Sequence, residues 1–282
     1  MKPRPAGDRR DQLRRRIQEL KNLPSLPLVV QKALQMVESS SASGRELSAE
    51  IEQDAALTGR VLKLVNSAFY GSAGTVSTVS HALVLLGFEV VKGVVLSASV
   101  FDMMNRGMMG LWEHSLGCGI AAKAIAQHTG ICEPEEASVC GLLHDVGKLA
   151  LMAEVPKSYA KLIDAARLTN HFLLDLENET MGTDHAEAGG WLAERWNLPK
   201  ALIVPIRYHH KPEFAEDDLD RSAIVHVADV LIKAHGYGFS GDEKVLPLRP
   251  FAREHLKLTL EDIETIAKDM SAEIAKAQAA EV

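Results

Sequence analysis

The sequence contains little cysteine and no long apolar run. Its 282 residues include three cysteines, Cys118, Cys132 and Cys140, an odd number without a CxxC pair. This excludes a disulfide framework and favours a reducing cytoplasm. We interpret each cysteine as a small core or surface residue. No stretch of about 18 consecutive apolar residues occurs, so no membrane span is predicted.

An excess of positive charge is also missing. Lys and Arg number 31 against 38 Asp and Glu, a formal net charge of −7, which argues against broad nucleic-acid binding. Residues 1–21 are the exception, with eight basic and three acidic side chains. We interpret this head as a solvated tail that runs into a first helix, with a contact arm for an acidic partner as the alternative. No apolar stretch follows it, so a signal peptide is not expected.

Apolar residues recur at helical spacing almost throughout the chain, without a convincing alternation of period two. Predicted helices begin at Leu28 and after Asp54, stop at Gly87, and begin again at Pro134 and after Thr259. Hydrophobic residues make up 46% of the chain, enough for a sizeable core. The predicted fold class is all-α.

Two long helices and one break are predicted between these points. Residues 89–104 and 134–151 are each predicted as one continuous helix, because their apolar spacing is not interrupted. Residues 106–110 are predicted as a break between two halves of the chain.

A short polar string interrupts one apolar helix at residues 142–148, which read Leu-Leu-His-Asp-Val-Gly-Lys. Burying the carboxylate of Asp145 beside His144 is costly unless it is paired or bound to a metal. Gly147 costs about 1 kcal/mol relative to alanine inside a helix, so we expect another element or a ligand to approach it closely. Lys148 falls on the same face as His144 and Asp145.

Further polar side chains of the same chemistry lie on separate predicted helices. They are His114, His185, the pair His209 and His210, and His226 with Asp229, which lie three residues apart on one face of one helix. Helical bundles build metal sites from imidazoles and carboxylates that converge from several helices. Nitrogen and oxygen donors suit Fe, Mn, Zn, Co or Ni, with Mg at a carboxylate-rich subsite. Asp145 has two oxygens and can bridge two ions, which together activate water and clamp a phosphoryl oxygen.

The other histidines receive a plainer interpretation. A lone histidine on a helix is usually a hydrogen-bonded core or surface residue, and we assign this role to His81, His128, His171, His235 and His255. His226 lies one turn before Asp229, and we interpret it as a donor that supports a ligand.

The order His, His-Asp, His, His-His, Asp resembles that of the HD superfamily of metal-dependent phosphohydrolases, which includes the HD-GYP group. A narrower resemblance comes from the first half. It contains Leu-Pro-Ser-Leu-Pro at 23–27, Gln-Asp-Ala-Ala-Leu at 53–57, Asn-Ser-Ala-Phe-Tyr-Gly at 66–71 and Val-Ser-His-Ala-Leu at 79–83. These strings are similar to those of the HDOD domain, which is found in bacterial signalling proteins. The resemblance covers about residues 23–236.

The resemblance implies a fold, a division of the chain and a set of ligands. The fold would be an HD-type helical bundle at 106–236, preceded by a tail at 1–21 and a helical subdomain at 22–105, and followed by a helical extension at 237–282. His114, His144, Asp145 and Asp229 match the ligands of one metal, and Asp145, His185, His209 and His210 those of a second. Lys148 matches a lysine that faces the phosphate, so Asp145 and Lys148 are the catalytic candidates.

The sequence also departs from these relatives. HDOD proteins commonly have an eroded HD site and no established activity, whereas this chain retains the ligand set. The Gly-Tyr-Pro signature of HD-GYP proteins is missing, because Lys211-Pro212 follows His210. We therefore do not expect cyclic di-GMP to be a good substrate. The string at 66–71 is expected to end a helix and shape a loop, with Phe69 or Tyr70 packed between the two halves.

Three functions stay open. The first is a cytoplasmic regulatory HDOD module that binds one or two divalent transition metals and acts mainly on a signalling protein partner. The second is a metal-dependent phosphohydrolase that acts on a nucleotide or phosphodiester. The third is a sensor that binds a nucleotide without cleaving it. The complete ligand set favours the enzyme, and the HDOD half together with the missing Gly-Tyr-Pro favours the module.

Overall fold

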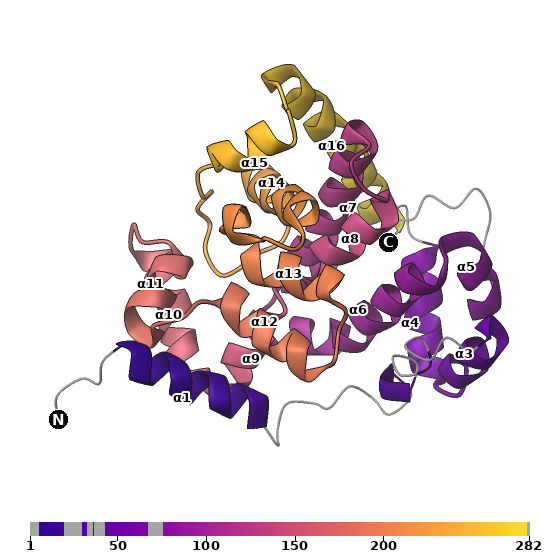
Figure 1. Cartoon of the computed structure of the whole chain (residues 1–282), viewed down its shortest axis with the longest axis horizontal. Helices are drawn as coiled ribbons and strands as arrows, with labels where there is room; N and C mark the ends of the chain where they lie inside the picture. The colour runs from indigo at the N-terminus through magenta and orange to yellow at the C-terminus, as the bar shows by residue number, and fades with distance from the viewer. Residues whose placement is uncertain (1–5, 20–29, 33–35, 37–42, 67–75, 281–282) are drawn as a thin grey trace.

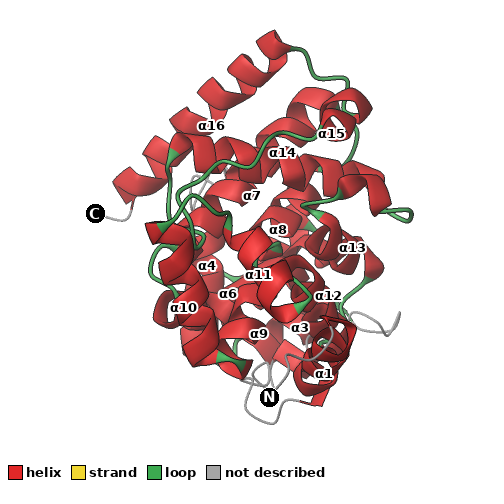
Figure 2. Cartoon of the chain, turned by 90° about the vertical axis from the view of Figure 1, so that its left-hand side faces the viewer, coloured by secondary structure: helices red, strands yellow, loops and turns green. Residues whose placement is uncertain are grey.

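The computed structural model describes residues 6–19, 30–32, 36, 43–66 and 76–280, and every regular element within them is helical (Figure 2). This confirms the predicted all-α class. The helices in chain order are α1 (Ala6–Glu19), α3 (Gly44–Ile51), α4 (Ala55–Val65), α5 (Val79–Leu86), α6 (Phe88–Gly107), α7 (Leu111–Thr129), α8 (Pro134–Leu143), α9 (Gly147–Glu154), α10 (Pro156–Leu168), α11 (Leu173–Met181), α12 (His185–Arg195), α13 (Lys200–Tyr208), the short 3₁₀ helix η1 (Pro212–Phe214), α14 (Leu219–His235), α15 (Pro250–His255) and α16 (Leu260–Ala280).

Several helix ends follow from single side chains. Asp54 accepts hydrogen bonds from the amides of Ala56 and Leu57 at 3.0 and 2.9 Å, and so caps α4. Ser43 and Glu46 form a reciprocal capping box at the start of α3. Gly87 has φ +81°, where glycine carries no Cβ penalty, and it ends α5 as predicted.

The helices gather into two groups joined by α6. In Figure 1, α3, α4 and α5 lie together on one side, and α4 and α5 pack against α6. Helix α6 also packs against α7, α8 and α9 of a larger bundle. Within that bundle α7 contacts α14, and α12 contacts α9 and α13. The bundle begins with α7 at Leu111, near the predicted break. The division into four regions otherwise stays a prediction.

The last helix is amphipathic and covers the bundle. Ile266, Met270 and Ile274 on one face of α16 are each 1% exposed, and α16 packs against α7. Its start is capped by a mutual arrangement of Thr259 and Asp262, whose side chains bond to each other's backbone amides at 3.1 and 2.8 Å.

The basic head departs from the prediction of a solvated tail. Residues Ala6–Glu19 form α1, which packs against α9, α11 and α12 (Figure 1). Leu13 and Ile17 are buried, at 7% and 0% exposure, because they lie four residues apart on one helical face. Arg10 forms an ion pair with Glu187 on α12. The arginines of α1 therefore surround a small apolar face. Because most residues of this segment are charged, the sequence alone does not reveal that face.

The predicted helix over 134–151 is also wrong in one respect, because it is two helices. α8 ends at Leu143, and α9 begins at Gly147. Between them, the amides of Val146 and Lys148 bond three residues back, to the carbonyls of Leu143 and Asp145 at 3.0 Å each. His144 and Asp145 therefore stand on a tight turn between helices.

Two expectations lie outside the described residues. These are the loop at 67–75 with Phe69 and Tyr70, and most of the helix expected to begin at Leu28. A transmembrane helix would have to be longer and more apolar than any helix in the described part of the chain.

Candidate metal centre

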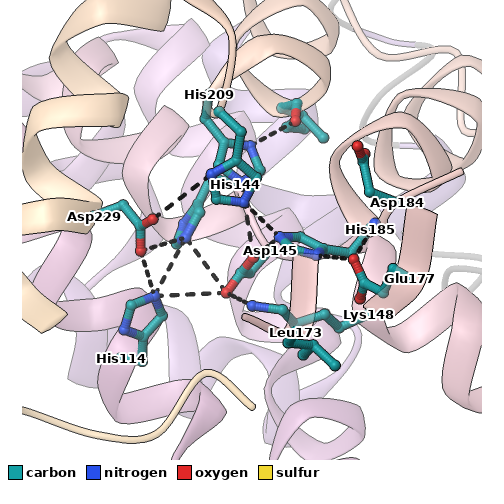
Figure 3. A network of polar contacts seen from close by, with 12 residues as sticks. His114, His144, Asp145, Lys148, Leu173, Glu177, Asp184, His185, His209 and Asp229 are labelled. Carbon is teal, nitrogen blue, oxygen red and sulfur yellow. Dashed lines mark hydrogen bonds and ion pairs between the residues drawn. The ribbon is translucent and has the colours of Figure 1, made fainter. Parts of the chain in front are cut away.

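The seven side chains predicted as metal ligands meet at the centre of the bundle, and Figure 3 labels all of them except His210. They are His114 on α7, His144 and Asp145 on the turn after α8, His185 at the start of α12, His209 and His210 after α13, and Asp229 on α14. None of them is more than 4% exposed. Five separate segments of the chain therefore deliver imidazoles and carboxylates to one buried point.

The first group of ligand atoms is compact. Nε2 of His114 lies 3.3 Å from Nε2 of His144, 3.5 Å from Oδ2 of Asp145 and 3.2 Å from Oδ1 of Asp229. Nε2 of His144 lies 3.4 Å from Asp145 Oδ2 and 3.8 Å from Asp229 Oδ1. Separations of this size are those of atoms that share one first-row metal ion with bonds of about 2.0–2.2 Å.

The second group uses the other oxygen of Asp145. Nε2 of His185 lies 3.3 Å from Asp145 Oδ1, and Nε2 of His209 lies 3.9 Å from the same oxygen. Nε2 of His210 is 2.8 Å from Nε2 of His185. Asp145 thus turns Oδ2 toward the first group and Oδ1 toward the second, which is the arrangement of a bridging carboxylate.

Hydrogen bonds fix the tautomer of three of these histidines. Nδ1 of His144 donates to the carbonyl of Gly141 at 2.7 Å, and Nδ1 of His209 donates to the carbonyl of Ile206 at 2.8 Å. In each case the ring bonds the carbonyl three residues earlier, where its own helix ends. Nδ1 of His185 donates to Glu177 at 2.6 Å. In a neutral imidazole a donor at Nδ1 leaves Nε2 unprotonated, and it is the Nε2 atoms of these rings that face the centre.

Four buried atoms at the centre have no hydrogen-bond partner among the described residues. They are Oδ1 of Asp145, Nε2 of His209, Nδ1 of His210 and Oδ1 of Asp229. Unsatisfied polar atoms of this kind are rare in protein cores, and a bound ion is one of the explanations for those that occur. Three of the four belong to the ligand atoms described above, so the residues fit a metal centre.

The protonation states suit metal binding. Burial lowers the pKa of His114 to about 4, and it lowers the pKa values of His209 and His210 well below their ordinary range. Burial alone would raise the pKa of Asp145, but the contacts with His144 and the positive charge of Lys148 outweigh it and hold that pKa well below its usual value. His114, His209 and His210 are therefore neutral imidazoles near pH 7, and Asp145 and Asp229 are ionised carboxylates, the forms that ligate metals.

Each carboxylate also has a lysine partner. Lys148, predicted to face a phosphate, forms an ion pair with Asp145 Oδ2 and is 1% exposed. Nζ of Lys233 lies 3.2 Å from Asp229 Oδ2. Burial would lower the pKa of Lys233, yet Asp229 and Asp145 raise it above its ordinary value. The two lysines balance the charge of the two carboxylates.

The sequence did not predict the residue that orients the His185 ring. Glu177 on α11 is fully buried and accepts hydrogen bonds from Nδ1 of His185 at 2.6 Å and from the Tyr159 hydroxyl at 2.6 Å. A carboxylate behind a metal-binding imidazole orients the ring and increases its basicity. Glu177 lies among ordinary helix-surface residues such as Asp175 and Glu179, so no local pattern singles it out.

His226 has the supporting position that was predicted for it. Its Nδ1 donates to the backbone carbonyl of His209 at 2.8 Å, and its Nε2 accepts from the Arg249 amide at 3.0 Å. Of the histidines given the plainer interpretation, His128 pairs with Asp262 and His255 with Asp220 at the surface.

Gly147 is explained by close helix packing. A Cβ at this position would overlap the carbonyl oxygen of His185 and would lie 2.8 Å from Cα of Gly189. Helices α9 and α12 therefore cross backbone to backbone, which sets His185 beside Asp145. The prediction that another element approaches Gly147 is confirmed.

A helical bundle whose centre collects these histidines and aspartates is the architecture of HD-type proteins. Residues 23–212 match the family model of the HDOD domain. The chain belongs to the HDOD family.

Three relatives illustrate this membership. An HDOD domain protein of unknown function from Geobacter sulfurreducens has 27% identity and a TM-score of 0.76, over 97% of each chain. A candidate phosphohydrolase from Shewanella amazonensis SB2B has 25% identity and a TM-score of 0.68, over 94% of this chain and 97% of that one. An uncharacterized protein of Treponema pallidum is 32% identical over 209 residues, 72% of this chain. The present chain spans 40% of the length of that relative.

Proposed function

We propose that this chain is a regulatory HDOD module that holds two divalent transition-metal ions in a closed centre. The observation that carries the proposal is the burial of a complete ligand set, none of it more than 4% exposed, around a carboxylate shared by two groups. His114, His144, Asp145 and Asp229 would hold one ion, and Asp145, His185, His209 and His210 the other. Fe, Mn, Zn, Co and Ni suit these donors.

The closed centre favours a binding role over turnover. A phosphodiester needs an open approach to the ions, and Lys148 would need to reach its phosphate. Here Lys148 is 1% exposed and is already paired with Asp145. We propose a cytoplasmic module that acts on a protein partner, for which the exposed Val84 and Leu85 on α5, at 84% and 54%, offer an apolar contact surface. Nucleic acid is not the proposed partner.

The second candidate is a metal-dependent phosphohydrolase. It is favoured because Asp145 turns one carboxylate oxygen toward each ligand group. Two bound ions would supply an activated water and a clamp for phosphoryl oxygens. In that role Lys148 would exchange its carboxylate partner for a phosphate of a nucleotide or phosphodiester. Cyclic di-GMP is not the proposed substrate, because Lys211-Pro212 replaces the Gly-Tyr-Pro loop.

Metal content and turnover of the same preparation separate these proposals. We expect protein purified without chelator, or reconstituted with Fe, Mn or Zn, to carry up to two ions per chain. Asp145→Asn should remove most of them, whereas the exposed Asp164→Asn on α10 should retain them. Chelation should lower the thermal midpoint, since an ion bound only to the native state stabilises that state.

Turnover is measured with bis(p-nitrophenyl) phosphate and cyclic di-GMP on the loaded protein. No hydrolysis above that of the Asp145→Asn variant is expected. Hydrolysis that depends on Asp145 would replace the regulatory proposal with the phosphohydrolase. A wild type that stays free of metal after reconstitution would make the cluster a structural remnant, held together by the Lys148 and Lys233 ion pairs.

A further inference from the structure

Cys118 stands at the edge of the first ligand group. It lies one helical turn after His114 on α7 and is fully buried. Its Sγ is 3.5 Å from Nε2 of His114. No pattern in the sequence separates this cysteine from Cys132 and Cys140, which is why all three are expected to be plain core or surface residues. Its position beside a ligand atom supports a different assignment.

The thiol forms a compact ligand group with three of the residues already described. His114, Cys118, His144 and Asp229 each place one ligand atom within 4.8 Å of all the others. An independent observation points to a ligand at the same place. Asp229 is 1% exposed, and its Oδ1, which faces this group, has no hydrogen-bond partner within the part of the chain that is described.

The separation of the thiol from His114 also suits a shared ion. Zinc binds imidazole nitrogen at about 2.0–2.1 Å and thiolate sulfur at about 2.3 Å, so the two atoms lie about 3.5 Å apart in a tetrahedral site. Asp145 Oδ2 already shares its charge with Lys148. A thiolate at Cys118 would bring a second negative charge to the group beside Asp229.

We propose that Cys118, as a thiolate, is a further ligand of the first ion, the one proposed to be held by His114, His144, Asp145 and Asp229. The inference rests on the proposed metal centre. The thiol proton leaves to solvent as the metal–sulfur bond forms. A mixed sulfur, nitrogen and oxygen set favours Zn or Co over Mn or Mg, because softer ligands select these metals. The second group, made of imidazoles and Asp145, keeps the harder character of a purely nitrogen and oxygen site.

Cobalt makes the bond visible, because a thiolate bound to Co²⁺ gives a charge-transfer band in the near ultraviolet that nitrogen and oxygen ligands do not give. We expect this band to grow with bound cobalt in the wild type and to be missing in Cys118→Ser. Cys140→Ser is the matched control, since Cys140 is equally buried but contacts the Ala201 carbonyl on α13. The control should retain the full band.

Affinity gives a second measurement that does not depend on cobalt. Loss of Cys118 should weaken zinc binding by at least about tenfold, the lower limit found even for residues behind the ligands. Manganese binding should change much less. A competing chelator dye reports both values, and circular dichroism checks that the variants are folded.

The outcomes of these experiments distinguish a failure of the Cys118 assignment from a failure of the proposed metal centre. Wild-type protein that binds cobalt without the charge-transfer band overturns the assignment of Cys118 and leaves the metal centre intact. A band that persists in Cys118→Ser also overturns it, and points to another thiol. Wild-type protein that binds no cobalt, zinc or manganese removes both proposals. If Cys118→Ser does not fold, the wild-type and Cys140→Ser spectra alone decide whether a thiolate is bound.

Discussion

At the scale of single residues, a side chain that orients a candidate metal ligand can be tested separately from the ligand itself. Glu177 bonds both Nδ1 of His185 and the Tyr159 hydroxyl in a fully buried position. We predict that Glu177→Gln weakens metal binding at the His185 group by about 10–100-fold, the usual effect of losing such a partner. Isothermal titration with zinc measures the change.

The control for this prediction lies on the same helix. Glu179 is two residues further along α11 and exposed, so Glu179→Gln should bind metal like the wild type. If Glu177→Gln also binds like the wild type, then His185 is held by packing alone, and the bond to Glu177 contributes nothing to the centre.

Gly147 gives a second prediction at this scale. We predict that Gly147→Ala lowers the free energy of unfolding by about 1–3 kcal/mol or more, because the methyl group would press the backbone of α12 away from α9. Urea denaturation measures it. Gly59→Ala on α4 is the matched comparison, since nothing lies within 4 Å of its added Cβ. That variant should be stabilised by up to about 1 kcal/mol. Equal effects of the two substitutions would contradict the close crossing.

At the scale of elements, α1 is the helix whose role changed most between sequence and structure. Ile17 is fully buried against the bundle although seven of its neighbours in residues 9–19 are charged. We predict that Ile17→Ala lowers the free energy of unfolding by about 2 kcal/mol, the lower end for a buried isoleucine, because α1 lies at the edge of the fold. Gln18→Ala, at an exposed position, should stay within about 0.5 kcal/mol of the wild type. No difference between the two variants would mean that α1 is undocked in solution.

The ends of most helices could be predicted from the sequence, and the interruption at His144 could not. Asp54, Gly87 and Thr259 act through bonds to their own neighbours, so their effect is visible in the local sequence. The turn after α8 depends on the His144 ring, which takes the Gly141 carbonyl that the Asp145 amide would bond in a continuous helix. The local sequence pattern does not indicate that the His144 side chain makes this bond.

The candidate site likewise contains residues that could be predicted from the sequence and residues that could not. The cost of burying Asp145 without a partner drew attention to the His-Asp pair, and the resemblance of the chain order to HD proteins selected the seven candidate ligands, which the fold brings together. Glu177 and Cys118 carry no such signal, since a glutamate on an amphipathic helix and a cysteine on an apolar one are both ordinary. Cys118 lies one helical turn after His114 on α7, and Glu177 on α11 meets His185 at the start of α12 only in the folded chain.

At the scale of the whole molecule, the buried histidines make stability depend on pH. Burial lowers the pKa of His114 to about 4, whereas the unfolded chain has a value near 6.5. As the pH falls, the unfolded state therefore takes up the proton first. The contribution of His114 is complete above about pH 6.5 and is lost on the way down to about pH 4. His209 and His210 shift in the same direction.

We therefore predict that the chelated protein loses about 2 kcal/mol of unfolding free energy between pH 7 and pH 5 from His114 alone. Urea denaturation at a series of pH values measures the slope. His114→Gln removes the titrating ring, so its slope should be shallower by that amount. Parallel curves for the two proteins would show that His114 keeps an ordinary pKa when folded.

The crossing of α9 and α12 has a consequence for how such a molecule can change over evolutionary time. Its contact atoms are main chain, namely Gly147, Gly189 and the carbonyl of His185. Replacing an imidazole removes chemistry from the centre but leaves this contact in place, whereas replacing either glycine disturbs it. Histidines and glycines are thus under separate mutational constraints. A lineage can lose its ligands one by one while the architecture persists, and the scaffold remains available for a role that needs only its surface.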